Sequence, residues 1–261
     1  MYDELYDPIP SLDQYLERLG LKRPAVYDLD FLDSMILAHQ YSVPFENLEV
    51  HEDGLKISLS TDHLFDKIVV RKRGGYCFEL NALFSKALEA CGYDFFSVLA
   101  RVIVGDDYSI PSLHRLAIVE IDNEQYVCDV GFGGAQPGFA LKLEDGYSKS
   151  FCGQTFNIKQ DNGKWMITYI PRSGGQEEPT MEFFAINAEE VDFFAPNFYC
   201  CAHEDSVFVK SRFVNLRTPN GSKSIFENQF AINENGARTE MEIEDEEQLT
   251  ELLVSHFGIE R

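Results

Sequence analysis

The sequence lacks the features that would place the protein in a membrane or on nucleic acid. No apolar run approaches the length that crosses a bilayer, and the amino terminus lacks the basic and apolar regions of a secretion signal. Positive charge is scarce, with 22 basic residues against 44 acidic ones and a net charge of −22. Such a field repels polyanions, so neither nucleic acid nor an anionic membrane is an expected partner. We therefore expect a soluble cytoplasmic protein.

The sequence also lacks a pattern that would pair its cysteines or hold a metal ion. It contains no C-x-x-C and no His/Cys pattern at ligand spacing. A chain of 261 residues is long enough to fold without a disulfide framework. We therefore expect reduced thiols and no metal. The six cysteines are Cys77, Cys91, Cys128, Cys152, Cys200 and Cys201.

The length exceeds the usual size of a single hydrophobic core, which favours two or three packed units that share a cleft. The chain has no internal repeat and no low-complexity linker. Apolar residues at three-and-four spacing predict helices in residues 1–94, and short β-branched and aromatic runs predict strands in 95–195. Residues 196–261 mix strands with a final helix. The pattern indicates an α+β protein with a small antiparallel barrel or sandwich at its centre.

Local signals mark where these elements begin and end. The helix signals are a capping box at Ser11 and Gln14, Gly20 as a stop, Asp28 as a start, Pro44 as a stop, Ser60 or Thr61 as a start, and Gly92 as a stop. The predicted strands span 95–104, 115–121, 125–130, 151–159, 165–170, 207–216 and 224–232, and the final helix spans 244–256. The clearest turns are Asn162-Gly163 and Pro219-Asn220-Gly221.

Residues 73–81 carry the most informative motif, Arg-Gly-Gly-Tyr-Cys-Phe-Glu-Leu-Asn. It places Cys77 in the first turn of an amphipathic helix, where the positive end of the helix dipole favours a thiolate and lowers the thiol pKa. Gly74 and Gly75 permit an unusual backbone path into the helix, and the basic residues 71–73 add positive charge. The alternative for Cys77 is a small apolar core residue.

Two further residues offer the partners that a reactive thiol needs. His114 begins a predicted strand and can face a cleft, although the chain has five other histidines and a surface or core role is the alternative. Asp129 interrupts an apolar run, and a buried carboxylate requires a hydrogen-bonded partner such as an imidazole. A hairpin turning at 122–124 brings Asp129 near His114. Nucleophile, base and orienting acid are then all present.

With these residues in place, the chain resembles the arylamine N-acetyltransferases over nearly its whole length. The matching segments are 73–81, the strand at His114, Asp129-Val130-Gly131-Phe132-Gly133, Val43-Pro44-Phe45-Glu46-Asn47-Leu48, and His256-Phe257-Gly258-Ile259. The resemblance implies a helical bundle (1–94), a β-barrel (95–195) and an α/β lid (196–261), with acetyl-coenzyme A as donor and an aromatic amine or hydrazine as acceptor.

The resemblance also implies a role for each matching residue. Cys77 would accept the acetyl group, His114 would act as base, and Asp129 would orient it. Phe45 and Phe132 are candidates for the aromatic amine pocket, although the core is the alternative for any one phenylalanine. The remaining pair, Gly133 and Gly134, would approach the coenzyme A pyrophosphate.

One segment departs from the family pattern. Residues 197–208 read Asn-Phe-Tyr-Cys-Cys-Ala-His-Glu-Asp-Ser-Val-Phe, where the family usually has Ser-Thr-His-Pro after two aromatic residues. This puts coenzyme A affinity and acceptor choice in doubt, because the Glu204-Asp205 pair would repel an anionic cofactor. An anion would have to bind through glycine N–H groups or through the cations Lys210, Arg212 and Arg217, for which an ordinary solvated strand face is the alternative.

The mechanism that these residues indicate is a double displacement through an acetyl-cysteine. Two other classes fit the same residues. A transglutaminase-like enzyme or thiol hydrolase uses the same order of Cys, His and Asp but takes acyl groups from amides. A non-catalytic binding protein could keep the fold without turnover.

Overall fold

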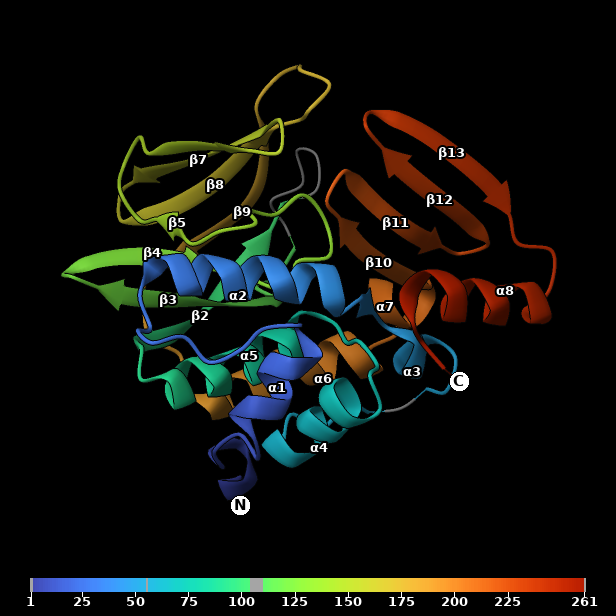
Figure 1. The fold of residues 1–261 in the computed structure, drawn as a ribbon, viewed down its shortest axis with the longest axis horizontal. Helices are drawn as coiled ribbons and strands as arrows, with labels where there is room; N and C mark the ends of the chain where they lie inside the picture. The colour runs from blue at the N-terminus through green and yellow to red at the C-terminus, as the bar shows by residue number, and fades with distance from the viewer. Residues whose placement is uncertain (1, 55, 104–109, 261) are drawn as a thin grey trace.

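The computed structural model describes residues 2–54, 56–103 and 110–260. Helices occupy its first third and strands dominate the rest, so the predicted α+β class is confirmed (Figure 1). The first helices are α1 (Leu12–Arg18), α2 (Leu29–Ser42), α3 (Leu48–His51), α4 (Thr61–Phe65) and α5 (Cys77–Cys91), with a 3-10 turn η1 (Asp3–Leu5) and a π-helical turn η2 (Asp66–Val70). None of the described helices is both long and apolar enough to span a bilayer.

The predicted helix boundaries mostly agree with the observed ones. The Ser11 hydroxyl accepts a hydrogen bond from the Gln14 N–H at 3.3 Å, and the Asp28 carboxylate accepts one from Phe31 at 3.0 Å. Gly92 ends α5 in the left-handed region with φ of 80°. Ser60 occupies the cap position of α4, but its side chain accepts no hydrogen bond from that helix.

The α5 helix is the centre of the helical part. It contacts α1 and α4 on one side and strands β2 and β3 of the larger sheet on the other. Only Glu89 and Ala90 of its fifteen residues are exposed, which is typical of a helix enclosed by protein on all faces. Its first residue, Cys77, is therefore fixed between the helices and the sheet.

The larger sheet has eight antiparallel strands in the order β5-β4-β3-β2-β9-β8-β7-β6, and it curves like a barrel (Figure 1). Its strands are β2 (Asp94–Val102), β3 (His114–Ile121), β4 (Glu124–Cys128), β5 (Leu141–Lys142), β6 (Ser148–Phe151), β7 (Gln154–Asp161), β8 (Lys164–Ile170) and β9 (Glu178–Phe184). One apolar cluster, which includes Val98, Leu116 and Phe156, fills its inner face. The predicted end of the first strand at Val104 lies outside the described residues.

Three predicted strands are wrong in detail. The segment 224–232 is not continuous, because Glu227 has a positive φ and the chain turns there between two paired strands, Gly221–Phe226 and Gln229–Glu234. The segment 151–159 is not continuous, because Cys152 and Gly153 both have positive φ and form the turn between β6 and β7. The segment 207–216 begins as a helical turn, α7 (Val207–Lys210), since the Ser206 hydroxyl caps it by accepting a hydrogen bond from Phe208. Short β-branched and aromatic runs predicted a continuous strand in each place, and a local turn or cap overrides them.

The second sheet joins the two ends of the chain. Its order is β1-β10-β11-β12-β13, so the amino-terminal strand β1 pairs with a strand from the last quarter of the sequence. The strands are β1 (Phe45–Glu46), β10 (Phe213–Thr218), β11 (Gly221–Phe226), β12 (Gln229–Glu234) and β13 (Ala237–Glu242). The remaining elements are η3 (Glu190–Phe193), α6 (Phe194–Ala202), α8 (Glu246–Leu252) and η4 (Leu253–Phe257).

Candidate active site

The structure brings Cys77, His114 and Asp129 together from three elements. Cys77 is the first residue of α5, His114 is the first residue of β3, and Asp129 directly follows β4. A two-residue turn at Asp122 and Asn123, both with positive φ, joins β3 to β4 in the register that predicts the approach of His114 and Asp129. The His114 Nε2 and Asp129 Oδ2 atoms lie 2.7 Å apart.

Asp129 is buried, and hydrogen bonds satisfy both of its oxygens. Oδ2 faces His114, while Oδ1 accepts hydrogen bonds from Asn81 Nδ2 at 2.9 Å and from the Gly131 N–H at 2.8 Å. Burial alone would raise the pKa of this carboxyl, but the His114 charge and these hydrogen bonds outweigh it and lower the pKa below its ordinary value. The carboxylate is therefore ionised and fixed in place.

The charge beside the Cys77 sulfur comes from His114. Burial lowers the pKa of this imidazole, but the Asp129 carboxylate and the Cys77 sulfur outweigh burial and raise the pKa to about 10. The thiol is 3% exposed, and burial raises its pKa above the ordinary value, although the hydrogen bond and charge of His114 offset part of this effect. The predicted lowering of the thiol pKa is therefore wrong. The group that favours a Cys77 thiolate is therefore the His114 imidazolium, which acts against the effect of burial.

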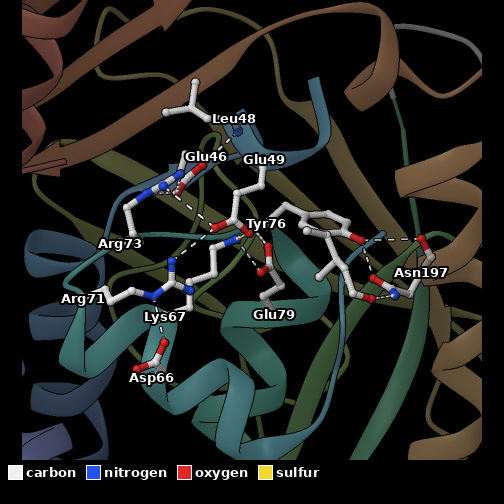
Figure 2. A network of polar contacts seen from close by, with 11 residues as sticks. Glu46, Leu48, Glu49, Asp66, Lys67, Arg71, Arg73, Tyr76, Glu79 and Asn197 are labelled. Carbon is white, nitrogen blue, oxygen red and sulfur yellow. Dashed lines mark hydrogen bonds and ion pairs between the residues drawn. The ribbon is translucent and has the colours of Figure 1, made fainter. Parts of the chain in front are cut away.

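The expected contribution of Arg71 and Arg73 to the positive charge beside Cys77 is wrong. Arg73 forms an ion pair with the fully buried Glu46 at 2.9 Å, and Arg71 pairs with Asp66 at 2.8 Å. Figure 2 shows these arginines turned toward carboxylates within one polar network. Carboxylates neutralise their charge there, and the largest influences on the pKa of Cys77 are burial and His114 instead.

The same network fixes the backbone at the start of α5. Lys67 is 1% exposed and forms ion pairs with Glu79 at 2.7 Å and with Glu49 at 2.9 Å. Glu79 in turn accepts a hydrogen bond from the N–H of Tyr76, the residue before Cys77 (Figure 2). Tyr76 is held at its other end, where its hydroxyl donates to Asn197 of α6.

The glycine pair of the motif is required for close packing. Neither Gly74 nor Gly75 has a positive φ in this structure. A Cβ at Gly74 would lie 2.0 Å from the Pro44 carbonyl oxygen, and Gly75 forms a β-bridge with Phe45. The glycines let the segment before α5 pack directly against β1. Glycine is required here because of close packing, and not because of the unusual backbone path that the sequence predicted.

The predicted pocket residues surround the three groups at different places. The Phe132 ring meets the His114 ring edge-on, with centroids 5.7 Å apart. Phe45 packs near Phe208 with ring centroids 6.0 Å apart, and the backbone of Gly133 lies against the Phe45 ring.

A cleft of about 430 Å³ lies beside this site. The two sheets and the loop after β4 line it, and Phe45, Val130, Gly133 and Gly134 are among its walls. Gly131 packs on Cys77 instead, since a Cβ there would lie 3.0 Å from the Cys77 Cα. The loop 130–134 therefore contacts the cleft on one side and the reactive groups on the other.

Sequence reasoning missed Asn81 as an individual residue. Its amide group donates to Asp129 and to the Arg115 carbonyl oxygen, and its own oxygen accepts from the Val130 N–H. The spacing from Cys77 is four residues, which places both side chains on one helix face and could have indicated a shared site. No comparable pattern marks Arg172, which also lines the cleft.

Comparison with known proteins decides the family. A family model described as N-acetyltransferase matches residues 28–260. The chain is 31% identical over 252 residues to a Salmonella typhimurium protein named arylamine N-acetyltransferase / N-hydroxyarylamine O-acetyltransferase, covering 95% of this chain and 88% of that protein. It is 30% identical to human arylamine N-acetyltransferase 1, covering 95% and 94%.

The chain belongs to the arylamine N-acetyltransferase family. It is therefore an acyltransferase, as its resemblance to that family predicts. The crystal structure of the Salmonella typhimurium arylamine N-acetyltransferase superposes with a TM-score of 0.90 at 28% identity, covering 97% of this chain and 92% of that one. The Mycobacterium marinum arylamine N-acetyltransferase in complex with CoA gives a TM-score of 0.88 at 26% identity, covering 95% and 93%.

The segment that departs from the family pattern lies outside the cleft. None of residues 197–208, all of which the structure describes, is part of the lining. Cys200 and Cys201 are buried in α6, and Asp205 pairs with Lys210 at 3.1 Å. The predicted repulsion between the Glu204-Asp205 pair and an anionic cofactor stays a prediction.

Proposed function

We propose that this acyltransferase moves an acetyl group from acetyl-coenzyme A to the nitrogen of aromatic amines or hydrazines through an acetyl-Cys77 intermediate. The observation that carries the proposal is the buried His114–Asp129 pair at 2.7 Å beside a cysteine at a helix start. The names of the relatives support an aromatic amine as acceptor, and the Mycobacterium marinum structure with CoA supports the donor.

In the first half-reaction the Cys77 thiolate attacks the thioester carbonyl carbon. A bond forms between this sulfur and the acetyl carbon, and the backbone N–H of Cys77 at the helix start stabilises the oxyanion. The bond from carbon to the coenzyme A sulfur then breaks, and the leaving thiolate takes the proton of His114. This leaves acetyl-Cys77 and a neutral imidazole, still oriented by Asp129.

In the second half-reaction the neutral His114 acts as a base. It removes a proton from the amine as the nitrogen attacks the acetyl carbon, and the bond from carbon to the Cys77 sulfur breaks. The amide leaves, and the thiolate–imidazolium pair is restored. Phe132 supports this step, because its ring beside His114 can hold an aromatic acceptor next to the base. Phe45 would extend the same apolar wall.

The donor fits the cleft in our proposal. Gly133 and Gly134 line it, and backbone there can approach a pyrophosphate without a side chain in the way. The cytoplasm suits this chemistry because it keeps thiols reduced, and the cysteines of the described chain are all unpaired.

Initial-rate kinetics test the function. With acetyl-coenzyme A and an acceptor such as aniline varied together, double-reciprocal plots should give parallel lines, the pattern of a ping-pong mechanism. The Cys77→Ser variant should release no coenzyme A above background. Cleavage of peptide amides without dependence on acetyl-coenzyme A would instead establish the transglutaminase-like or thiol hydrolase alternative.

A further inference from the structure

The cleft beside Cys77 contains two arginines and no acidic residue. Arg172 and Arg217 are in its lining, and none of the described residues around them there is Asp or Glu. This composition is unusual for a chain with 44 acidic and 22 basic residues. The cleft is therefore positively charged, although the protein as a whole is negatively charged and repels anions.

Neutral oxygens position both guanidinium groups. Arg217 Nη1 donates to Gln40 Oε1 at 2.6 Å and to the Gln136 carbonyl oxygen at 2.8 Å. Arg172 donates from Nε to the Cys152 carbonyl oxygen and from Nη1 to the Asn220 carbonyl oxygen, each at 2.7 Å. These contacts orient the two cations without neutralising either charge.

Lys210 and Arg212, which the sequence groups with Arg217 as possible anion-binding residues, both pair with carboxylates. Arg212 pairs with Glu52 at 2.8 Å, and Lys210 pairs with Asp205 at 3.1 Å. Neither lines the cleft. Carboxylates therefore already satisfy these two, whereas no ion pair with Arg172 or Arg217 occurs among the residues that the structure describes.

The two arginine side chains form hydrogen bonds that link separate elements around the cleft. Arg217 extends from β10 to α2 and to the loop after β4. Arg172 joins the β6–β7 turn of the larger sheet to the β10–β11 turn of the second sheet. Each guanidinium thus joins different elements that line the cleft. An anion bound between the two would relieve their mutual repulsion.

We propose that Arg172 and Arg217 form a binding site for the phosphate groups of acetyl-coenzyme A. The planar guanidinium suits phosphate oxygens because it donates two parallel hydrogen bonds. Phe45 and Val130 line the same cleft, and Gly131 of the following loop packs on Cys77. The donor would lie with its phosphates at the arginines and its thioester toward the sulfur. This inference rests on the proposed function.

The variants Arg172→Gln and Arg217→Gln test the site. Each should raise the KM for acetyl-coenzyme A roughly tenfold or more, because a charge-assisted hydrogen bond to phosphate is lost. The kcat at saturating donor should stay within about twofold, because the reacting groups are unchanged. Lys210→Gln is the matched control: it removes one positive charge outside the cleft and should leave the KM unchanged.

A donor without phosphate separates binding from folding. The rate of Cys77 acetylation by 4-nitrophenyl acetate should be the same in the parent and in both arginine variants. Arg217→Lys should restore part of the affinity, since it keeps the charge but loses the paired hydrogen bonds. An equal loss with both donors would show a structural role and overturn the proposal, as would an unchanged KM for acetyl-coenzyme A.

Calorimetric titration with adenosine 3′,5′-bisphosphate tests the site without catalysis. The parent should bind it, and both glutamine variants should bind it at least tenfold more weakly. If parent and variants bind dephospho-coenzyme A equally, the arginines contact the 3′-phosphate. If the variants lose as much affinity for dephospho-coenzyme A as for coenzyme A, the arginines contact the pyrophosphate. Absence of bisphosphate binding and equal affinities of parent and variants for coenzyme A would overturn the phosphate site. Failure of 4-nitrophenyl acetate to acetylate Cys77 in the parent would instead contradict the proposed function.

Discussion

Asn81 is the residue on which the position of Asp129 depends. It donates to Asp129 at 2.9 Å and accepts from the Val130 N–H at 3.0 Å, so it fixes both the carboxylate and the loop that follows. We expect Asn81→Ala to lower kcat/KM about 10- to 100-fold, because a hydrogen bond to a charged group contributes about 1.5–3 kcal/mol. Steady-state rates measured across pH would report the change.

Ser85→Ala provides the control for this substitution. Ser85 is buried one turn further along α5 and donates to the Asn81 carbonyl oxygen, away from Asp129. It should leave kcat/KM within about twofold. The pH–rate profile of the Asn81 variant should also shift, since Asp129 would orient His114 less firmly. An unshifted profile with full activity would show that Asn81 serves the fold alone.

His114 should make stability depend on pH in the alkaline range. Its pKa is raised from 6.5 to about 10 in the folded state, so the folded form binds the proton more tightly than the unfolded form. This contribution is complete below pH 6.5 and is lost as the pH rises through about 10. The free energy of unfolding of the parent should exceed that of His114→Asn by a few kcal/mol at low pH, since each pKa unit corresponds to about 1.4 kcal/mol.

Urea unfolding of both proteins at several pH values checks this expectation. The difference between them should shrink steadily as the pH increases from 6.5 toward about 10. A difference that stays constant over this range would mean that His114 carries no excess proton affinity in the folded state.

At the level of the elements, the start of α5 depends on the ion pairs of Lys67. This side chain is 1% exposed between Glu49 and Glu79, and Glu79 holds the Tyr76 N–H. Lys67→Met would leave the buried Glu79 without its cation and would leave Glu49 with the more distant Arg71 and Arg73, at 3.7 and 3.8 Å. We expect a loss of about 3–5 kcal/mol in the free energy of unfolding, the usual cost of removing one partner from a buried pair.

Two further variants make the Lys67 experiment specific. Adding Glu79→Gln to Lys67→Met should recover part of the lost stability, because one unpaired charge is then removed. Arg71→Met is the matched control on the same network. Arg71 is 44% exposed, and its loss should cost less than about 1 kcal/mol. Equal losses of unfolding free energy in Lys67→Met and Arg71→Met would contradict the stabilising role of the buried Lys67 ion pairs.

For the whole molecule, Asn47 links the amino-terminal part to the second sheet. Its amide donates to the carbonyl oxygens of Phe208 and Ser211, and its side-chain oxygen accepts from the Phe213 N–H, all within 2.8 Å. Asn47→Ala should lower the free energy of unfolding by about 2–4 kcal/mol, since three hydrogen bonds are lost. Hydrogen exchange should accelerate in Phe208–Phe213 and much less in the larger sheet.

Asn187→Ala is the control for this link. Asn187 is exposed and donates to the nearby Glu189 carboxylate, so its loss should change neither stability nor exchange appreciably. Uniform acceleration across both sheets in the Asn47 variant would show that the residue stabilises the fold as a whole instead of this connection.

Much of the fold is predictable because its signals are local. Helix starts at Ser11 and Asp28 and the Asn162-Gly163 turn depend on a few adjacent residues, and they occur as predicted. The pairing of β1 with β10 involves segments far apart in the chain, and no local pattern reveals it. The domain boundaries after residues 94 and 195 stay a prediction, which limited proteolysis can test.

The active site is predictable from the sequence only in part. The approach of His114 and Asp129 follows from one hairpin, whereas the source of the charge near Cys77 does not follow from sequence neighbours. Arg71 and Arg73 lie close to Cys77 in the chain. Asp66 and Glu46 neutralise their charges through contacts that only the folded structure creates. The two arginines of the cleft, Arg172 and Arg217, are likewise 45 residues apart in the chain. Arg172 lies in a loop of the larger sheet, and Arg217 lies in a strand of the second sheet.

Intact-protein mass spectrometry after brief exposure to acetyl-coenzyme A, without an acceptor, tests the central claim most directly. The protein should gain the mass of one acetyl group, located on Cys77 by peptide mapping, and should lose it when aniline is added. Cys77→Ala should gain nothing. Turnover without an acetyl group on Cys77, or a Cys77→Ala variant with undiminished activity, would contradict the account.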